Sequence, residues 1–227
     1  MIFKQAFDKK TSTFTYIIAS AKGREAVIID PVIENVDNYI KLLEELDLKL
    51  VKVIDTHIHA DHVTGASKLK QVTNCATVMG EHTLAETVEI KVKDNEIIDI
   101  DNLKIKSLYT PGHTSDSYSF LLNNYLFTGD TLLINGTGRT DFQNGSSEDA
   151  YNSLFNKILK LPEETLVYPG HDYNGKFSST IRNEKKFNPR LQVISMNEYV
   201  DIMSNLNLSK PKLIESNVSR NIKLGAN

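Results

Sequence analysis

The chain has 227 residues, enough for one large domain around a sizeable core. Its 26 basic and 29 acidic residues give a formal net charge of -3. This balance does not favour nucleic-acid binding through a basic face, or attachment to an anionic membrane. No apolar stretch has the length of a membrane span, and the first residues do not predict a signal peptide. The single cysteine, Cys75, cannot form an internal disulfide, so we predict a cytoplasmic protein.

The first part of the chain alternates between expected strands and one amphipathic helix. Aromatic and β-branched residues predict strands at residues 2–7, 14–19 and 25–30. Apolar residues then recur at helical spacing over residues 36–46, with lysine and glutamate between them. Such a helix packs its apolar face on a sheet, so we expect sheets that are covered on the outside by helices.

A cluster of metal-ligand residues follows the next expected strand, at residues 50–55. The cluster comprises His57, His59, Asp61 and His62. Residues 63–72 then show helical spacing, so the cluster lies on a strand-to-helix turn. His57 and His59 are two residues apart and point the same way if the segment is extended. Neutral imidazole and carboxylate groups are ligands of divalent metals, which favours a metal site over a polar turn.

Three later strands end in turns that each contain one more potential ligand. These are His113 after residues 103–109, Asp130 after residues 125–127, and His171 after residues 165–167. Gly129 allows the backbone to approach a neighbour closely before Asp130. Four strand ends with a ligand each predict a metal site at the edge of a sheet. The remaining histidine, His82, has no partner at ligand spacing, and we expect it on a surface helix.

The full ligand set resembles that of the metallo-β-lactamase superfamily. It consists of His57-x-His59-x-Asp61-His62 followed by His113, Asp130 and His171. The resemblance implies an α/β fold, the αββα sandwich, in which two mixed sheets are covered by outer helices and the metal lies at one edge. We expect residues 1–227 to form a single domain of this fold, with a short helical C-terminal extension from about 178 to 227.

A narrower resemblance, to the persulfide dioxygenase (sulfur dioxygenase, glyoxalase II-like) branch, covers nearly the whole chain. The segments that resemble it are residues 57–65, 138–143, 168–175, 188–191 and 205–211. The resemblance implies one non-haem Fe(II) per chain, held by His57, His113 and Asp130. It also implies a glutathione persulfide that dioxygen oxidises to sulfite and glutathione. The other ligand-type residues are then hydrogen-bond partners of the ligands and of bound water: His59, Asp61, His62 and His171.

Two segments depart from the pattern of this branch. Thr137 stands where the branch commonly has cysteine, and residues 115–117 stand where it usually has Asp-Gly. Neither segment contains one of the three expected iron ligands. Two histidines and one carboxylate on one face of an iron leave adjacent positions open for a persulfide sulfur and for dioxygen.

Two other functions remain open. One is a thioester hydrolase like glyoxalase II, in which two Zn ions use all seven ligand residues and Asp130 bridges them. The ligand inventory alone favours this binuclear site, whereas residues 139–143 and the short C-terminus favour a single iron. The other is a non-catalytic member of the superfamily, which the complete ligand set argues against.

Substrate contacts are expected from Arg139 and Tyr173. A guanidinium is the natural partner of a glutathione carboxylate, and Arg139 follows the Asp130 turn closely. The hydroxyl of Tyr173, two residues after His171, can donate to a carboxylate or a sulfur. The alternatives are a structural ion pair between Arg139 and Asp141, and a packed aromatic ring for Tyr173. Whether the chain forms a homodimer is left open.

Overall fold

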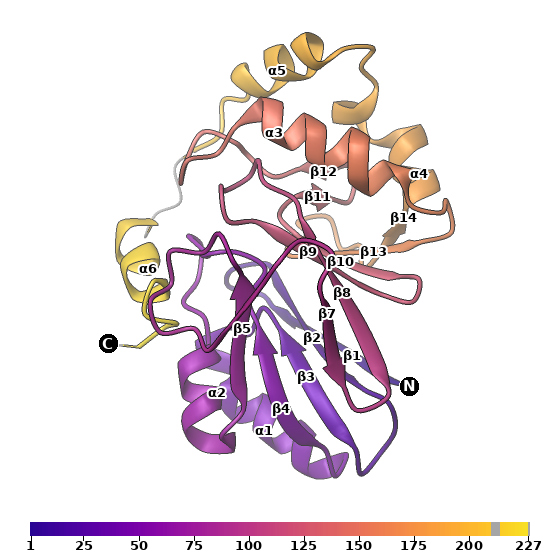
Figure 1. Ribbon diagram of the computed structural model, residues 1–227. Helices are drawn as coiled ribbons and strands as arrows, with labels where there is room; N and C mark the ends of the chain where they lie inside the picture. The colour runs from indigo at the N-terminus through magenta and orange to yellow at the C-terminus, as the bar shows by residue number, and fades with distance from the viewer. Residues whose placement is uncertain (210–213, 227) are drawn as a thin grey trace.

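Two six-stranded sheets packed face to face form the centre of the computed structural model, which describes residues 1–209 and 214–226 (Figure 1). The first sheet has the spatial order β1 (Ile2–Asp8), β2 (Thr13–Ala19), β3 (Glu25–Ile29), β4 (Lys49–Ile54), β5 (Ala76–Gly80) and β6 (Ile90–Val92). The second has the order β14 (Ser179–Thr180), β13 (Leu166–Pro169), β10 (Tyr125–Gly129), β9 (Tyr118–Leu122), β8 (Leu103–Tyr109) and β7 (Ile97–Ile100). Both contain parallel and antiparallel pairs, as the mixed-sheet prediction requires. A small ribbon pairs β11 (Leu132–Leu133) with β12 (Gly136–Thr137).

Helices cover the outer faces of the two sheets, and this confirms the predicted αββα sandwich (Figure 1). The first sheet is covered by α1 (Val36–Glu45) and α2 (Ala66–Thr73), with the short helix η1 (Ile33–Asn35) before α1. The second sheet is covered by α3 (Ser147–Tyr151), η2 (Asn152–Lys157), η3 (Ile158–Lys160), α4 (Ile181–Phe187), η4 (Pro189–Leu191) and α5 (Met196–Ser204). The last helix, α6 (Ile214–Asn221), lies apart from α5, beside the loops that follow the first sheet.

The layers follow from the two-residue period of the strands. In β2, Tyr16 and Ile18 belong to the cluster between the two sheets, whereas Ile17 and Ala19 belong to the cluster under α1 and α2. Successive side chains of a strand point to opposite faces, so a strand that is buried on both faces needs an unbroken apolar run. The apolar sequence of β2 therefore places it between two hydrophobic layers.

Serine caps fix the starts of two covering helices. The Ser146 Oγ accepts a hydrogen bond of 3.1 Å from the Asp149 amide before α3. The Ser195 Oγ accepts one of 3.3 Å from the Glu198 amide before α5. Each cap satisfies an amide that the first turn of a helix leaves unpaired.

Two expectations need correction or completion. His82 is exposed as expected, but it lies in a turn after β5 rather than on a helix, and its ring is 4.1 Å from that of Tyr109. The C-terminal region from residue 178 is mainly helical, yet it also contributes the edge strand β14. Residues 210 and 211, which end the 205–211 motif, lie outside the described residues. No helix in the described ranges has the length and hydropathy of a membrane span.

Candidate metal centre and adjoining cavity

The ligand residues meet because four strands end at one edge of the sandwich. In the second sheet β8 and β10 are both antiparallel to β9, and β13 is parallel to β10. The carboxyl ends of β8, β10 and β13 therefore lie at the same edge, where His113, Asp130 and His171 follow. Residues 57–62 come from the first sheet, after β4. The predicted convergence of strand ends is confirmed.

The three expected iron ligands form one compact group. One ligand atom from each of His57, His113 and Asp130 lies within 4.8 Å of the other two. The His57 Nε2 and the Asp130 Oδ1 are buried and have no hydrogen-bond partner among the described residues. The His113 Nε2 lies 3.6 Å from the Asp130 Oδ2. Buried polar atoms without partners cost free energy, so this arrangement fits a bound divalent cation.

Hydrogen bonds to the Nδ1 atoms of His57 and His113 leave the Nε2 atom of each ring for the candidate metal site. The His113 Nδ1 lies 2.8 Å from the Arg139 carbonyl oxygen, which can only accept, so Nδ1 holds the proton. The His57 Nδ1 lies 2.9 Å from the Thr56 Oγ1, which itself donates to the Asp30 carboxylate over 3.0 Å. The Thr56 hydroxyl proton is thereby used, and the His57 Nδ1 must donate. Both Nε2 atoms keep their lone pairs for a metal.

Asp30 is a functional residue that the sequence analysis did not identify. Its carboxylate accepts from the Thr56 amide over 2.7 Å and lies 3.1 Å from the His59 Nε2. It therefore orients two histidines of the cluster, His57 through Thr56 and His59 directly. The available signal was its position, because Asp30 follows β3 in the same way that the ligands follow their own strands.

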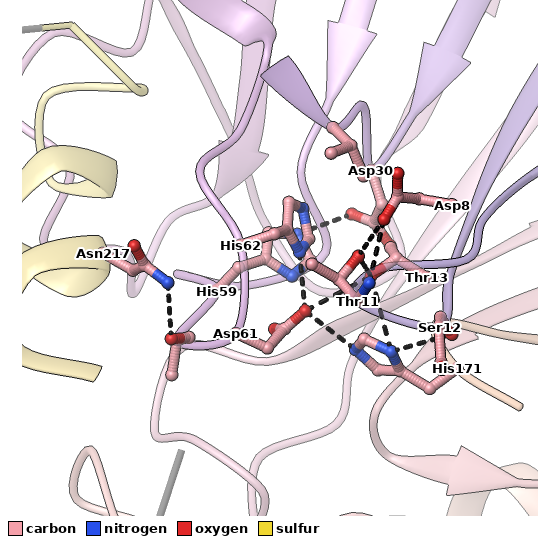
Figure 2. A network of polar contacts seen from close by, with 12 residues as sticks. Asp8, Thr11, Ser12, Thr13, Asp30, His59, Asp61, His62, His171 and Asn217 are labelled. Atoms are coloured by element: carbon pink, nitrogen blue, oxygen red, sulfur yellow. Dashed lines mark hydrogen bonds and ion pairs between the residues drawn. The ribbon is translucent and has the colours of Figure 1, made fainter. Parts of the chain in front are cut away.

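One carboxylate oxygen of Asp61 is surrounded by three side chains, those of Thr13, His62 and His171, as Figure 2 shows. The Asp61 Oδ2 accepts from the His62 Nδ1 over 2.8 Å and from the Thr13 Oγ1 over 3.3 Å, and it lies 3.4 Å from the His171 Nε2. On its other side, the His171 ring contacts the Ser12 carbonyl at 3.1 Å. The His59 Nδ1 and the His62 Nε2 remain without a partner among the described residues.

The pKa shifts of the site follow its burial and its charge balance. Burial lowers the pKa of the His57 and His59 imidazoles well below the usual value, and neighbouring histidines add to this. Burial alone would raise the pKa of Asp130, but His171, His113 and His57 outweigh it and lower the pKa. Burial opposes the charged form of His171, yet Asp130 and Asp61 prevail and raise its pKa to about 10. The site thus holds neutral His57 and His59 imidazoles beside an ionised Asp130, the protonation state in which these groups bind metals, whereas His171 keeps its proton between Asp61 and Asp130.

A cavity of about 560 Å³ opens beside His113, Asp130 and His171. Arg139 and Tyr173 both line it, as their expected contact with substrate requires. A cavity of this size is in the range of small-molecule sites.

The Arg139 guanidinium forms the structural ion pair that was the alternative to substrate contact. Its Nε and Nη2 lie 2.7 Å and 2.8 Å from the two carboxylate oxygens of Asp141. Its Nη1 donates to the Ser209 carbonyl over 2.7 Å, and the guanidinium carbon lies 4.4 Å from the centre of the Phe142 ring. Contact between Arg139 and substrate stays a prediction.

Tyr173 is not a packed aromatic residue, because it is 70% exposed. Its ring lies parallel to that of His171, with the ring centres 6.0 Å apart. The hydroxyl therefore has room to meet a ligand in the cavity, and its contact with substrate stays a prediction.

Arg190 is a cavity residue to which the sequence analysis gave no role. It lines the cavity from η4, and its Nη1 donates to the carbonyl and hydroxyl oxygens of Thr137. Among residues 1–209 and 214–226, no carboxylate forms an ion pair with it. Burial lowers its pKa, but a guanidinium stays charged at neutral pH. The available signal was the resemblance of residues 188–191 to the persulfide dioxygenase branch, but only the fold brings residue 190 to the site.

The two departures from the branch pattern have structural roles near the site. The Thr137 hydroxyl lies 3.1 Å from the Tyr199 hydroxyl in the wall of the cavity. In the turn after His113, the Ser117 Oγ accepts from the Thr114 amide over 3.2 Å, and the Asp116 carboxylate accepts from the Ile58 amide over 3.2 Å. Asp116 thus ties the His113 turn to the loop of the first ligands.

Comparisons with known proteins agree with this geometry. The family model described as "Metallo-beta-lactamase superfamily" matches residues 9–171. The human protein "Persulfide dioxygenase ETHE1, mitochondrial" is 40% identical over 228 residues, which cover 99% of this chain and 89% of that protein. The "Hydroxyacylglutathione hydrolase" of Dictyostelium discoideum is 37% identical over 186 residues, which cover 76% of this chain and 68% of that protein. The crystal structure of ETHE1 from Myxococcus xanthus is 46% identical, covers 100% of both chains and has a TM-score of 0.97.

Proposed function

The chain belongs to the metallo-beta-lactamase superfamily, and from this membership we propose that it is a persulfide dioxygenase. The observation that carries the proposal is the similarity to proteins named persulfide dioxygenase. It extends over nearly the full length of both chains and includes the residues that build the metal centre. Its substrates are glutathione persulfide and O2, and its products are sulfite and glutathione. The same membership supports an enzyme rather than a non-catalytic relative, because every ligand residue is present.

His57, His113 and Asp130 would hold one Fe(II) per chain. Bound there, the iron would supply the electrons that dioxygen needs for its reaction with the persulfide sulfur. The protein prepares this site through the hydrogen bonds behind the rings, which leave both Nε2 atoms unprotonated. It also buries the Asp130 Oδ1 without a partner, so that the carboxylate is ready to bind the cation.

The cavity residues would bind and orient the tripeptide part of the substrate. Arg190 offers a guanidinium that has no carboxylate partner in the described ranges, so it can pair with a glutathione carboxylate. The Tyr173 hydroxyl can donate a hydrogen bond at the side of the cavity where His171 lies. Holding the sulfur next to the metal in this way makes the reaction intramolecular and favours it strongly.

The rival function is a binuclear zinc thioester hydrolase, and two observations favour it. The His59 Nδ1 and the His62 Nε2 have no partner in the described part of the chain, so nitrogen ligands for a second ion remain. The chain also resembles a hydroxyacylglutathione hydrolase. The single-iron site is supported by the Asp61 Oδ2, which already accepts from His62 and Thr13. A second ion that bound this oxygen would have to replace these hydrogen bonds.

Metal analysis of the purified protein, with two activity assays, tests this proposal. We expect close to one iron per chain, oxygen uptake when glutathione persulfide is added, and no hydrolysis of a glutathione thioester. Two zinc ions per chain together with thioester hydrolysis would reject the dioxygenase and support the hydrolase.

His171→Ala distinguishes one bound ion from two. If His171 acts only through its contact with Asp61 and its ion pair with Asp130, the variant should keep its iron and lose about 10–100-fold in rate. Iron content and oxygen uptake of the same preparation measure both quantities. Complete loss of metal would mean that His171 is a direct ligand, as a binuclear site requires.

Three further expectations stay predictions. They are the cytoplasmic location, the division of residues 1–227 into a single domain with a C-terminal extension, and the question of a homodimer. Analytical ultracentrifugation of the purified protein would answer the last of them.

A further inference from the structure

The helix α6 contacts the ligand loop through two buried asparagine side chains. It lies beside the loop that follows β4, and Figure 2 shows Asn217 directed at the backbone of that loop. Asn217 is 5% exposed and Asn221 is 2% exposed. Asparagine is mostly found at protein surfaces, so two buried asparagines on one helix indicate a specific polar contact.

Asn221 forms three hydrogen bonds with the loop. Its Nδ2 donates to the carbonyl oxygens of His59 and His62, both over 2.8 Å. Its Oδ1 accepts from the Thr64 amide over 3.0 Å. Asn217 adds a fourth bond, from its Nδ2 to the Ala60 carbonyl oxygen over 3.0 Å. Two side chains thus satisfy four backbone groups within the segment that contains the histidine and aspartate ligands.

The loop depends on such contacts because it has little regular structure of its own. Residues 56–63, all within the described ranges, form neither helix nor strand. Their buried backbone groups therefore need partners from elsewhere in the protein. The path of this backbone determines where the imidazole of His57 points, and metal sites tolerate errors of only about 0.5 Å.

We propose that Asn221, assisted by Asn217, is a positioning residue that holds the ligand loop in the geometry needed for metal binding. The C-terminal helix would in this way set the affinity of a metal site built from strands of the two sheets. Only an amide side chain offers two donor hydrogens and an acceptor oxygen on one planar group. This inference depends on the proposed function at one point only, because it assumes that the bound ion is the catalytic ion.

Asn221→Asp is the sharpest test because it keeps the shape and the acceptor but removes both donors. The new carboxylate would face the carbonyl oxygens of His59 and His62 without a hydrogen to share. We expect the affinity for ferrous ion to fall about 10–100-fold, as for other partners behind metal ligands. Anaerobic competition with a chelator, well below the melting temperature, measures this affinity without any turnover.

Two controls separate positioning from general destabilisation and from added charge. Ser219→Asp places the same charge on an exposed position of α6. Leu43→Ala removes a buried side chain of α1, and should lower Tm. The Leu43 carbonyl accepts from the Leu48 amide, directly before the amino end of β4, whereas the ligand loop follows its carboxyl end. Both controls should keep the ferrous affinity of the unchanged protein.

An Asn221→Asp protein with lower Tm and unchanged ferrous affinity would overturn the proposal, because the asparagine would then be structural only. If that variant does not fold, Asn217→Asp serves instead, because it removes only the bond to the Ala60 carbonyl oxygen. We then expect the ferrous affinity to fall a few-fold. An unchanged affinity would overturn the proposal. Repeating the titrations with Zn²⁺ alone keeps this test independent of the reaction. A thioester hydrolase that binds zinc more weakly after Asn221→Asp would reject the dioxygenase but support the positioning role.

Discussion

The metal end and the substrate end of the cavity are built in different ways. At the metal end, every ligand follows a central strand of one of the two sheets, and four of the seven ligand residues lie within six positions of one loop. At the substrate end, Arg139, Arg190, Tyr173 and Leu208 come from loops and short helices that have no common strand pattern. The first end follows the strands of the two sheets, although the loop of residues 57–62 is itself irregular, and the second end is built from loops and short helices.

Chemistry that tolerates little positional error is thus placed at the ends of the sheet strands. Metal ligands must lie within a fraction of an ångström of their ideal places, and strand ends supply that rigidity. Contacts with a flexible tripeptide tolerate more movement, and loops that differ between relatives can supply them. We therefore expect substitutions at the metal end to abolish activity, and substitutions at the substrate end to change KM by graded amounts.

His113→Ala should produce the largest effect. It removes one of the three proposed ligands, and the Asp130 carboxylate loses the imidazole that lies 3.6 Å from its Oδ2. Both iron content and oxygen uptake should be lost, and metal analysis beside an oxygen electrode measures them. His82→Ala is the matched control, because this exposed histidine lies in a turn outside the site. Retention of one iron per chain in His113→Ala would contradict the ligand assignment.

The same difference explains how much of the molecule the sequence predicted. The apolar runs of β1 to β3 and the helical spacing of α1 are local patterns, and they correctly predicted strands that are covered by a helix. The ligand turns were predicted because the same pattern recurs, in which a strand ends in a turn that contains a histidine or an aspartate. Asp30 follows that pattern too but was missed, because a single aspartate before proline also fits an ordinary turn.

Pairings between distant residues could not be predicted from local patterns. The pair of Arg139 with Asp141, two residues apart, was one of the alternatives in the sequence, whereas nothing local shows which residue Arg190 contacts. The fold decides this by placing Asp141 against Arg139 and by bringing Arg190 to Thr137. The contact of α6 with the ligand loop joins residues 157 to 162 positions apart, beyond the range of any helix or strand period.

Arg190→Ala should produce the second largest effect, and comparison with Arg139 sharpens the contrast between the two arginines. A lost charged hydrogen bond to a substrate carboxylate is worth roughly 1.5–3 kcal/mol, or about tenfold or more in kcat/KM. Iron content should stay the same, because arginine is not a ligand. Arg190→Lys should also be harmful, since lysine lacks the planar fork. Steady-state oxygen uptake against persulfide concentration measures these changes.

Arg139 should respond differently because its guanidinium is occupied by Asp141. We expect Arg139→Ala and Asp141→Asn to lower Tm by similar amounts. Arg182→Ala serves as the control for both arginines, since its exposed ion pair with Glu163 lies outside the cavity. A tenfold fall in kcat/KM for Arg139→Ala with unchanged Tm would instead assign the substrate carboxylate to Arg139.

Tyr173→Phe should produce the smallest effect. It therefore tests whether substitutions at the substrate end change KM by graded amounts. The ring stacks on His171 and is retained in phenylalanine, so the variant removes only the hydroxyl. A neutral hydrogen bond contributes about 0.5–1.5 kcal/mol, which corresponds to roughly two- to tenfold in KM with kcat nearly unchanged. Tyr125→Phe is the control, because Tyr125 begins β10, at the end of the strand opposite Asp130. A fall in kcat at constant KM would show that the hydroxyl acts on the reacting sulfur, and the separation between a rigid metal end and an adaptable substrate end would then fail at this residue.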